Sequence, residues 1–216
     1  MQVRDTEAKT TERRAACYRL FSAAFCLPGE SFFAEEDVHD FATLLSGLDS
    51  EAAGSVSAMA GALAQTARDD LVIEYSRLFV GPFTLAAPPY GSVYLDDGRR
   101  LMGDSTIDAV RHYREVGIDM DPVHHDVPDH IAVELEFMSY LLHLEQVAAE
   151  QGDESAVADS QERQQTFLEK HLCAWVPTFA ERIEPEAQCE FYRELVRATN
   201  AFVTEDLERL RAGNEA

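Results

Sequence analysis

Apolar residues recur along most of this chain at steps of three and four, the spacing that places them on one face of an α-helix. Phe191, Leu195 and Phe202 follow this pattern near the end of the sequence. No segment shows the strict alternation of apolar and polar residues that is typical of a β-strand. The sequence therefore predicts an all-α fold, a compact multi-helix bundle of about ten helices.

Glycine, proline and polar runs separate the helical segments. Residues 81–98 form the one long segment without helical spacing, and its three prolines cannot sit inside a helix. Residues 151–160 are predicted to be a polar linker. The predicted helices are a first one ending before Pro28-Gly29, then segments around 41–48 and over 51–67, 69–80, 105–116, 128–150, 161–175 and 186–211, with Pro177 in the first turn of a further helix.

The chain has 216 residues, which is enough to bury one substantial core, and we expect a single domain over residues 1–216. A proline-containing loop at 118–128 separates an N-terminal helical block, about 1–118, from a C-terminal block, about 129–216. Such a loop can act as a hinge, which would let one molecule's C-terminal block pack on the N-terminal block of a second molecule.

The charge balance excludes several classes of partner. Lys+Arg number 18 against 40 Asp+Glu, so the formal net charge is −22 at pH 7. A surface this acidic repels phosphate groups, which argues against nucleic acid and anionic membranes as partners. It suits a partner that carries Arg or Lys, although the same charge also simply promotes solubility.

Cysteine usage and hydropathy indicate a cytoplasmic protein. Cys17, Cys26, Cys173 and Cys189 form no C-x-x-C pair and are too few for a disulfide scaffold, so we expect reduced thiols. No apolar stretch approaches the roughly 18 residues that span a bilayer, so stable membrane insertion is not expected.

Arg13-Arg14, followed by a partly apolar run, has the outline of a twin-arginine export signal. Arg19 interrupts that run, however, and Tyr18, Phe21 and Phe25 recur at helical steps. These residues therefore predict an amphipathic first helix that packs on the core.

Residues 127–142, VPDHIAVELEFMSYLL, raise three alternatives. His130 and Glu134 share one face of the predicted helix, beside a core stripe. They could bind a metal with His124, His125 and Asp126, or form an acid–base pair. In a structural alternative, Asp129 caps the helix and His130 packs against the preceding loop. Local residues leave the choice open.

Three segments resemble motifs of the TorD/DmsD family of redox-enzyme maturation chaperones, to which the NarJ group is related. The first comprises EYSRLFVGP at 74–82 and PPYGSVY at 88–94, and the second is PDHIAVELEFM at 128–138. The third comprises Phe167-Leu168, His171-Leu172, Trp175, Pro177 and Phe179. They occur in the family's order. One departure is Gly91, where the family usually has Glu, which removes a carboxylate from the expected binding surface.

The resemblance implies an all-helical cytosolic chaperone with no catalytic residues, metal or cofactor of its own. Such chaperones bind the twin-arginine leader, and sometimes the apo body, of a molybdopterin-dependent oxidoreductase catalytic subunit, and they delay export until the cofactor is inserted. Guanine-nucleotide binding has been suggested for some members, but this sequence has no G-x-x-x-x-G-K-[ST] loop. The family includes swapped dimers, so a monomer and a domain-swapped dimer are both expected to be possible.

A leader offers guanidinium groups and an apolar segment, so its receptor needs carboxylates and an apolar groove. Asp129, Glu134 and Glu74 are the candidate carboxylates. The alternative function is a metal- or nucleotide-dependent enzyme that uses the His124–His130 region. The full set of predicted peptide-binding residues is Glu74, Leu78, Phe79, Pro82, Pro88, Pro89, Tyr90, Tyr94, Asp129, His130, Glu134, Phe137 and Met138.

Overall fold

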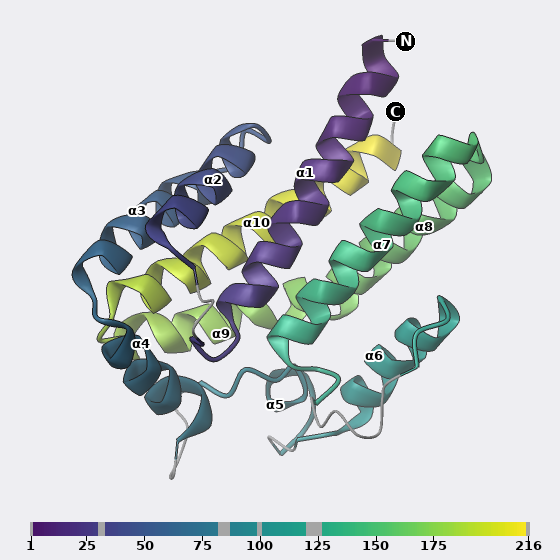
Figure 1. Ribbon diagram of the computed structural model, residues 1–216. Helices are drawn as coiled ribbons and strands as arrows, with labels where there is room; N and C mark the ends of the chain where they lie inside the picture. Colours follow the sequence, from purple (N-terminus) through teal and green to yellow (C-terminus); the bar gives the residue numbers. More distant parts are fainter. Residues whose placement is uncertain (1, 30–32, 82–86, 99–100, 120–126, 215–216) are drawn as a thin grey trace.

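The computed structural model describes residues 2–29, 33–81, 87–98, 101–119 and 127–214 (Figure 1). Within these ranges the chain forms ten α-helices, one π-helical turn and no β-strand, which confirms the all-α prediction. The elements are α1 (Gln2–Ala24), α2 (Glu35–Ser46), α3 (Ala52–Gln65), α4 (Arg68–Tyr75), the π-helical η1 (Ser76–Val80), α5 (Ser92–Leu95), α6 (Asp104–Glu115), α7 (Ile131–Gln151), α8 (Glu154–Lys170), α9 (Leu172–Glu186) and α10 (Glu190–Asn214).

Long helices pack side by side to enclose one core. α1 lies along α7, α3 lies along α10, and α7 turns back into α8 (Figure 1). Aromatic rings fill the space between them; Phe21 of α1, for example, lies 4.6 Å from the Phe41 ring and 5.3 Å from the Phe202 ring. The short α5 and the helix α6 lie at one end of this bundle, next to the start of α7.

The first helix belongs to this core, as its spacing predicted. Arg14 is only 4% exposed and donates to both carboxylate oxygens of Asp206 on α10, at 2.6 and 3.0 Å. The Tyr18 hydroxyl donates to the same carboxylate at 2.8 Å, and the Arg14 guanidinium also reaches Gln164 at 2.8 Å. The second arginine of the Arg13-Arg14 pair therefore forms a buried ionic link between α1 and α10.

Two helix boundaries differ from the sequence predictions. The expected linker 151–160 is only a tight turn: Gly152 ends α7 in the left-handed conformation, with φ of 73°, and the Asp153 carboxylate caps α8 by accepting from the Ala156 N–H. The helix predicted over 161–175 is broken at His171, and α9 begins at Leu172, so Pro177 lies beyond its first turn. Neither glycine nor proline marks that break.

The hinge predicted at 118–128 has most of its length, residues 120–126, outside the described residues. The two blocks that it was predicted to join are packed against each other through α1 with α7 and α3 with α10. Independent movement of the blocks, and the swapped dimer that it would allow, stay predictions.

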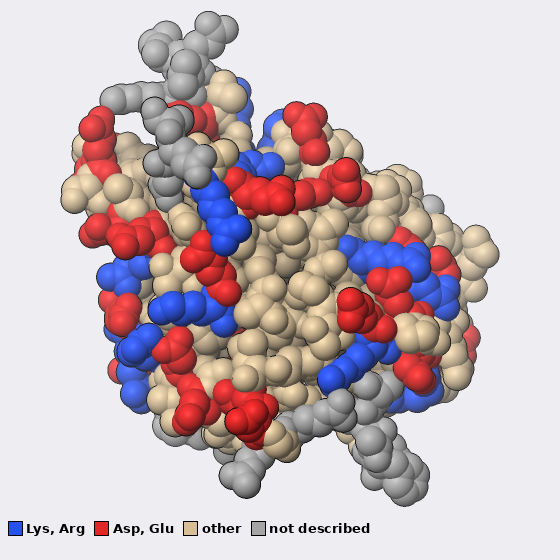
Figure 2. Space-filling model, turned by 180° about the vertical axis from the view of Figure 1, so that it is seen from behind, with Lys and Arg blue, Asp and Glu red and all other residues tan. Residues whose placement is uncertain are grey.

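Surface charge follows the composition. Seen from behind in Figure 2, basic side chains lie beside acidic ones around a largely uncharged centre. Arg163 pairs with Glu115, Arg197 with Glu184 and Arg211 with Glu169, so much of the basic charge is already neutralised. The four cysteines are not joined in disulfides, and in the described part of the chain no helix is both long and apolar enough to cross a membrane.

Candidate peptide-binding surface

The segment before α5 is held against the start of α7 by backbone hydrogen bonds. Gly91 N–H donates to the Asp129 carbonyl at 2.8 Å, and Ile131 N–H donates to the Pro89 carbonyl at 2.9 Å. Tyr90 and His130 form an isolated antiparallel bridge between the two segments. Two of the three family-like motifs are therefore fixed to each other at one end of the bundle.

Asp129 is fully buried at this junction, and its side chain caps α5 rather than α7, the helix that follows it in the sequence. Its Oδ2 accepts from the Ser92 N–H, at the start of α5, at 2.7 Å. The N-cap of α7 is instead His130, whose Nδ1 accepts from the Ala132 N–H at 3.2 Å. The predicted capping role of Asp129 on α7 is thus corrected, because its side chain turns toward α5.

Glu134 joins the third motif to the other two. It is fully buried on α7, and its Oε2 accepts from the indole N–H of Trp175 on α9 at 2.9 Å. Its Oε1 lies 3.6 Å from Nδ1 of His171. Burial raises the pKa of Glu134 despite these two favourable neighbours. Burial alone would lower the pKa of His171, but Glu134 and Asp108 outweigh it, so the pKa of His171 is raised.

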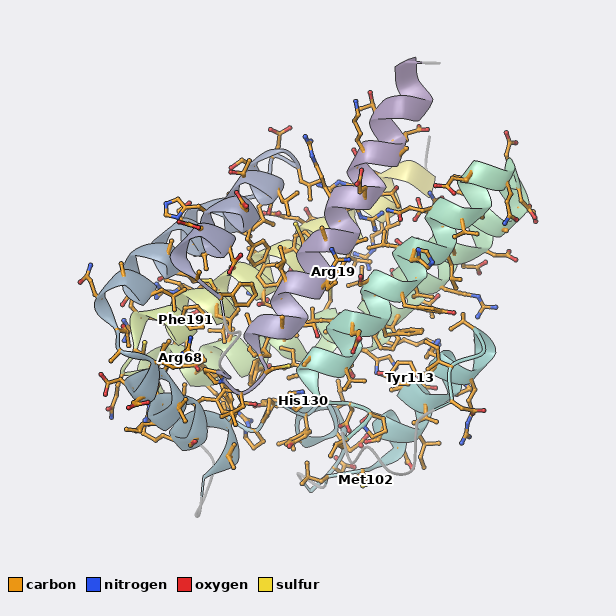
Figure 3. All side chains as sticks on the ribbon, viewed as in Figure 1. Arg19, Arg68, Met102, Tyr113, His130 and Phe191 are labelled. Atoms are coloured by element: carbon orange, nitrogen blue, oxygen red, sulfur yellow. The ribbon has the colours of Figure 1, made fainter. Side chains whose placement is uncertain are left out.

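Partly exposed side chains lie over this buried junction. Tyr90 meets the His130 ring edge-on at 5.2 Å, and Tyr94 stacks on Trp175 at 5.3 Å. The guanidinium of Arg182 lies over the Tyr94 ring, 4.7 Å from its centroid. Figure 3 shows His130 at the start of α7, where the chain leaves this end of the bundle. We call the half-buried set Pro88, Tyr90, Tyr94 and His130 the α5–α7 surface.

Position 91 has little room for a side chain. A Cβ atom placed on Gly91 would lie 3.2 Å from the Trp175 indole nitrogen and 3.3 Å from Oε1 of Glu134. These contacts are tighter than most Cβ contacts, so a side chain here would have to displace the Trp175–Glu134 pair slightly. Glycine at position 91, where the family usually has Glu, therefore allows the backbone at the start of α5 to lie close to the Trp175–Glu134 pair.

The predicted peptide-binding residues do not all meet at this surface. Asp129 and Glu134 are enclosed beneath it, so neither carboxylate reaches solvent in this structure. Leu78, Phe79, Phe137, Met138 and Pro89 are buried, the first four in the apolar core, and Pro82 lies outside the described residues. Phe79, for instance, packs edge-on against Tyr192 at 5.7 Å.

Glu74 has a different role, at the other side of the fold. Its carboxylate forms a two-pronged pair with Arg77 at 2.7 and 2.9 Å and accepts from the Gln188 N–H at 2.6 Å. It borders a shallow hollow of about 410 Å³ whose other walls include Asp70 and Ile73. Its hydrogen bonds join α4 to the turn before α10.

The Glu74 pair predicts a pH-dependent stability. Burial alone would raise the pKa of Glu74, but Arg77 and two backbone N–H groups outweigh it and hold the pKa below the usual 4.5. A depressed pKa stabilises the fold fully above 4.5, and the effect is lost as pH falls through the lower folded value. We expect Glu74→Gln to lower the free energy of unfolding by about 1.5–3 kcal/mol at neutral pH.

Urea unfolding followed by circular dichroism at several pH values measures this difference. The gap between wild type and Glu74→Gln should shrink as the pH falls below 4.5. Exposed Glu181, changed to Gln, is the matched control and should alter stability little. A gap that stays constant down to acid pH would contradict the assignment.

Sequence reasoning named Trp175 and His171 as motif residues but not as part of a site. The structure places both of them directly behind the α5–α7 surface. Their positions in the third motif were the one feature of the sequence that could have indicated a place near the site. Their contact with Glu134, from a helix more than thirty residues earlier, needed the three-dimensional arrangement.

Known proteins resemble this chain in sequence. A family model described as "Nitrate reductase delta subunit" matches residues 45–181. The chain is 29% identical over 178 residues to the Tat proofreading chaperone DmsD of Salmonella typhi, covering 77% of this chain and 79% of that one. It is also 29% identical over 205 residues to the chaperone protein TorD of Vibrio cholerae, covering 90% of each.

The fold has a counterpart among solved structures. A crystal structure of a candidate redox enzyme maturation protein from Archaeoglobus fulgidus matches with a TM-score of 0.56 at 24% identity. The match covers 88% of this chain and 93% of that chain. At this identity it supports the all-helical architecture alone.

The fold and the relatives define a class: an all-helical maturation chaperone, not an enzyme. Within that class, the chain belongs to the TorD/DmsD family, as its three motifs predicted. The alternative prediction of an enzyme using the His124–His130 region is therefore wrong. Residues 124–126 of that region lie outside the described residues, and Nδ1 of His130 is engaged by the Ala132 N–H.

Proposed function

We propose that this chaperone binds the twin-arginine leader of a molybdopterin-dependent oxidoreductase at the α5–α7 surface. In this role it also contacts the apo form of that enzyme, in the cytoplasm, and delays export until the cofactor is inserted. The observation that carries the proposal is the convergence of all three motifs behind one set of half-buried prolyl and aromatic side chains. The printed names of the relatives, a Tat proofreading chaperone among them, support the same role.

The surface suits the apolar segment of a leader. Tyr90 and Tyr94 present aromatic ring area that can cover apolar groups, and the Tyr94 hydroxyl itself is buried. Their backbone is already fixed by the bonds to Asp129 and Ile131, and Pro88 restricts it further. Little conformational entropy is therefore left to lose when a ligand binds.

Asp129 and Glu134 act in this proposal as positioning residues. Both carboxylates are enclosed and already accept hydrogen bonds, from Ser92 and Trp175 respectively. The guanidinium groups of a leader then need exposed carboxylates, and Asp97, exposed just after α5, is a candidate. The overall charge of −22 adds long-range attraction for such a cationic ligand.

The expected affinity is moderate. Burial of four or five apolar anchors contributes on the order of 6–15 kcal/mol. Association and ordering cost about 4–15 kcal/mol. The two ranges overlap, so binding is not expected to be very tight; a proofreading chaperone must release its ligand, which a micromolar complex of about 8 kcal/mol allows.

Tyr90→Ala tests the proposal. We expect the affinity for a synthetic peptide with a twin arginine and an apolar segment to fall about tenfold, or about 1.4 kcal/mol, because the peptide loses one ring of the surface. Isothermal titration calorimetry measures the affinity, and thermal unfolding should show a melting temperature within about a degree or two of wild type.

Two controls sharpen the result. Tyr140→Ala changes a half-buried tyrosine on α7, about 14 Å along the helix axis from Ile131 at its start. It should leave peptide affinity unchanged. A peptide with both arginines changed to glutamine should bind more weakly. Unchanged affinity and stability in Tyr90→Ala would place the peptide elsewhere, and a large fall in melting temperature would make Tyr90 a structural residue instead.

A further inference from the structure

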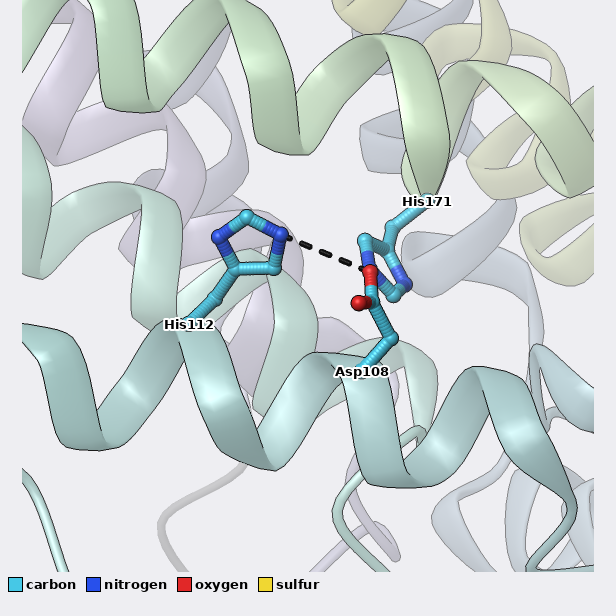
Figure 4. A group of neighbouring side chains, drawn as sticks. All are labelled: Asp108, His112 and His171. Carbon is cyan, nitrogen blue, oxygen red and sulfur yellow. Dashed lines mark hydrogen bonds and ion pairs between the residues drawn. The ribbon is translucent and has the colours of Figure 1, made fainter.

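Two histidines and an aspartate meet beside the α8–α9 junction (Figure 4). Asp108 and His112 lie one turn apart on α6, so they share a face of that helix. His171 comes from the break between α8 and α9. One ligand atom from each residue lies within 4.8 Å of the others. The geometry points to a site for one divalent transition-metal ion of the Zn²⁺ class, held by Asp108, His112 and His171.

The ligand spacing fits such an ion. Oδ2 of Asp108 lies 3.2 Å from Nε2 of His171 and 3.5 Å from Nε2 of His112. Zinc–nitrogen and zinc–oxygen bonds of about 2.0–2.2 Å at a tetrahedral centre place ligand atoms roughly 3.3–3.5 Å apart. Two of the three edges of the site are therefore already at the right length, and only the edge between the histidines is left to adjust.

His171 is held in the orientation that a ligand needs. Its ring stacks on Phe167 with centroids 4.5 Å apart, and its Nδ1 faces Oε1 of Glu134 at 3.6 Å. A metal-bound histidine commonly gives its second ring N–H to a carboxylate, which fixes both the tautomer and the ring. Glu134 is the carboxylate nearest to Nδ1, although 3.6 Å is too long for a hydrogen bond until the two side chains move closer, and Nε2 points toward Asp108 at 3.2 Å.

Hydrogen bonding within the cluster does not account for His112. Its side chain is 8% exposed, and its Nε2 is buried without a hydrogen-bond partner. Buried polar atoms are nearly always satisfied in folded proteins, so an unpartnered nitrogen aimed into a group of ligand atoms calls for a ligand. A metal ion satisfies His112 and His171 together.

The ligand types select the ion. Two imidazole nitrogens and one carboxylate oxygen suit Zn²⁺ and its first-row neighbours, whereas Mg²⁺ and Ca²⁺ prefer sites made of oxygen. Three protein ligands leave a position for water, and Asp108, 31% exposed, opens the site to solvent. The ion would link α6 to the α8–α9 junction, and this metal site is one that the sequence did not predict.

Zinc titration of the full chain, stripped with a chelator, tests the site. Isothermal titration calorimetry should show one Zn²⁺ per chain and no binding of Mg²⁺, and Co²⁺ should give the visible absorption of a low-symmetry site with nitrogen ligands. His112→Gln and Asp108→Asn should each abolish the stoichiometric binding. Glu134→Gln, which changes the carboxylate behind His171 and also the acceptor of the Trp175 N–H, should weaken Zn²⁺ binding about 10–100-fold, whereas Trp175→Phe, which removes only the Trp175 bond, should leave Zn²⁺ binding unchanged.

Two histidine controls exclude binding elsewhere. His143→Gln, an exposed change on α7, should keep the full stoichiometry and affinity. The double change His124→Gln with His125→Gln should do the same. Circular dichroism checks that each variant is folded, and Asp108→Asn, at a partly exposed position, serves where His112→Gln does not fold. No bound Zn²⁺ in the wild type, or binding that survives Asp108→Asn but not the His124 and His125 changes, would overturn the proposal.

Discussion

Asp206→Ala should lower the free energy of unfolding by about 3–5 kcal/mol. The change removes the carboxylate that accepts from Nε and Nη2 of the buried Arg14 guanidinium, and leaves it with Gln164 at 2.8 Å and the more distant Glu145 at 3.9 Å. It also removes the acceptor of the Tyr18 hydroxyl. Urea denaturation followed by circular dichroism measures the loss, because the helical signal reports unfolding of the whole bundle.

Arg209 provides a matched control for this experiment. It pairs with the same carboxylate at 3.0 Å, but its side chain is 33% exposed. Arg209→Ala should therefore cost no more than about 1 kcal/mol. Adding Arg14→Met to Asp206→Ala should recover part of the lost stability, since an apolar residue replaces a buried charge that has lost its nearest carboxylate. Equal losses for Asp206→Ala and Arg209→Ala would show that the buried pair is not a main source of stability.

Trp175 gives the second large effect. Trp175→Ala should cost about 3–5 kcal/mol, because the largest fully buried side chain leaves a cavity that borders Tyr94 and Phe179. Trp175→Phe keeps much of that packing but removes the N–H that reaches Glu134. It should cost about 1–3 kcal/mol, the penalty for leaving a buried acceptor unpaired.

A second substitution separates hydrogen bonding from packing. Glu134→Gln should cost less in the Trp175→Phe background than in the wild type, because the two residues are coupled through one bond. Equilibrium unfolding of the four proteins in this cycle gives the coupling free energy. Additive losses would mean that the indole N–H contributes nothing and that Trp175 acts by volume alone.

Helix periodicity predicted the long elements because their buried faces are continuous. It failed at residues 153–155, where α8 begins with exposed polar side chains that carry no core stripe. Asp153, read as part of a linker, was the local signal for a helix start, because an aspartate commonly caps the first turn. The break at His171 had no local signal at all, since the neighbouring residues suit a continuous helix.

The candidate site was predictable in its segments and not in its contacts. The three motifs identified the stretches that meet, including both segments of the isolated bridge between Tyr90 and His130. Spacing on one helix could not show that Asp129 turns away from α7 to cap α5. Spacing also could not show that Glu74 lies away from Asp129 and Glu134. Its position depends on a hydrogen bond from the Gln188 N–H, which is far along the chain.

The link between Arg14 and Asp206 also sets an order of events during synthesis. The two residues are 192 positions apart, so the guanidinium meets its carboxylate only after the segment that carries Asp206 has left the ribosome. Until then α1 carries a charge that stays hydrated and cannot enter an apolar interior at low cost. The newly made chain must therefore keep its first helix partly solvated while the others form. The chaperone's own folding thus includes a late step in which α1 joins α10.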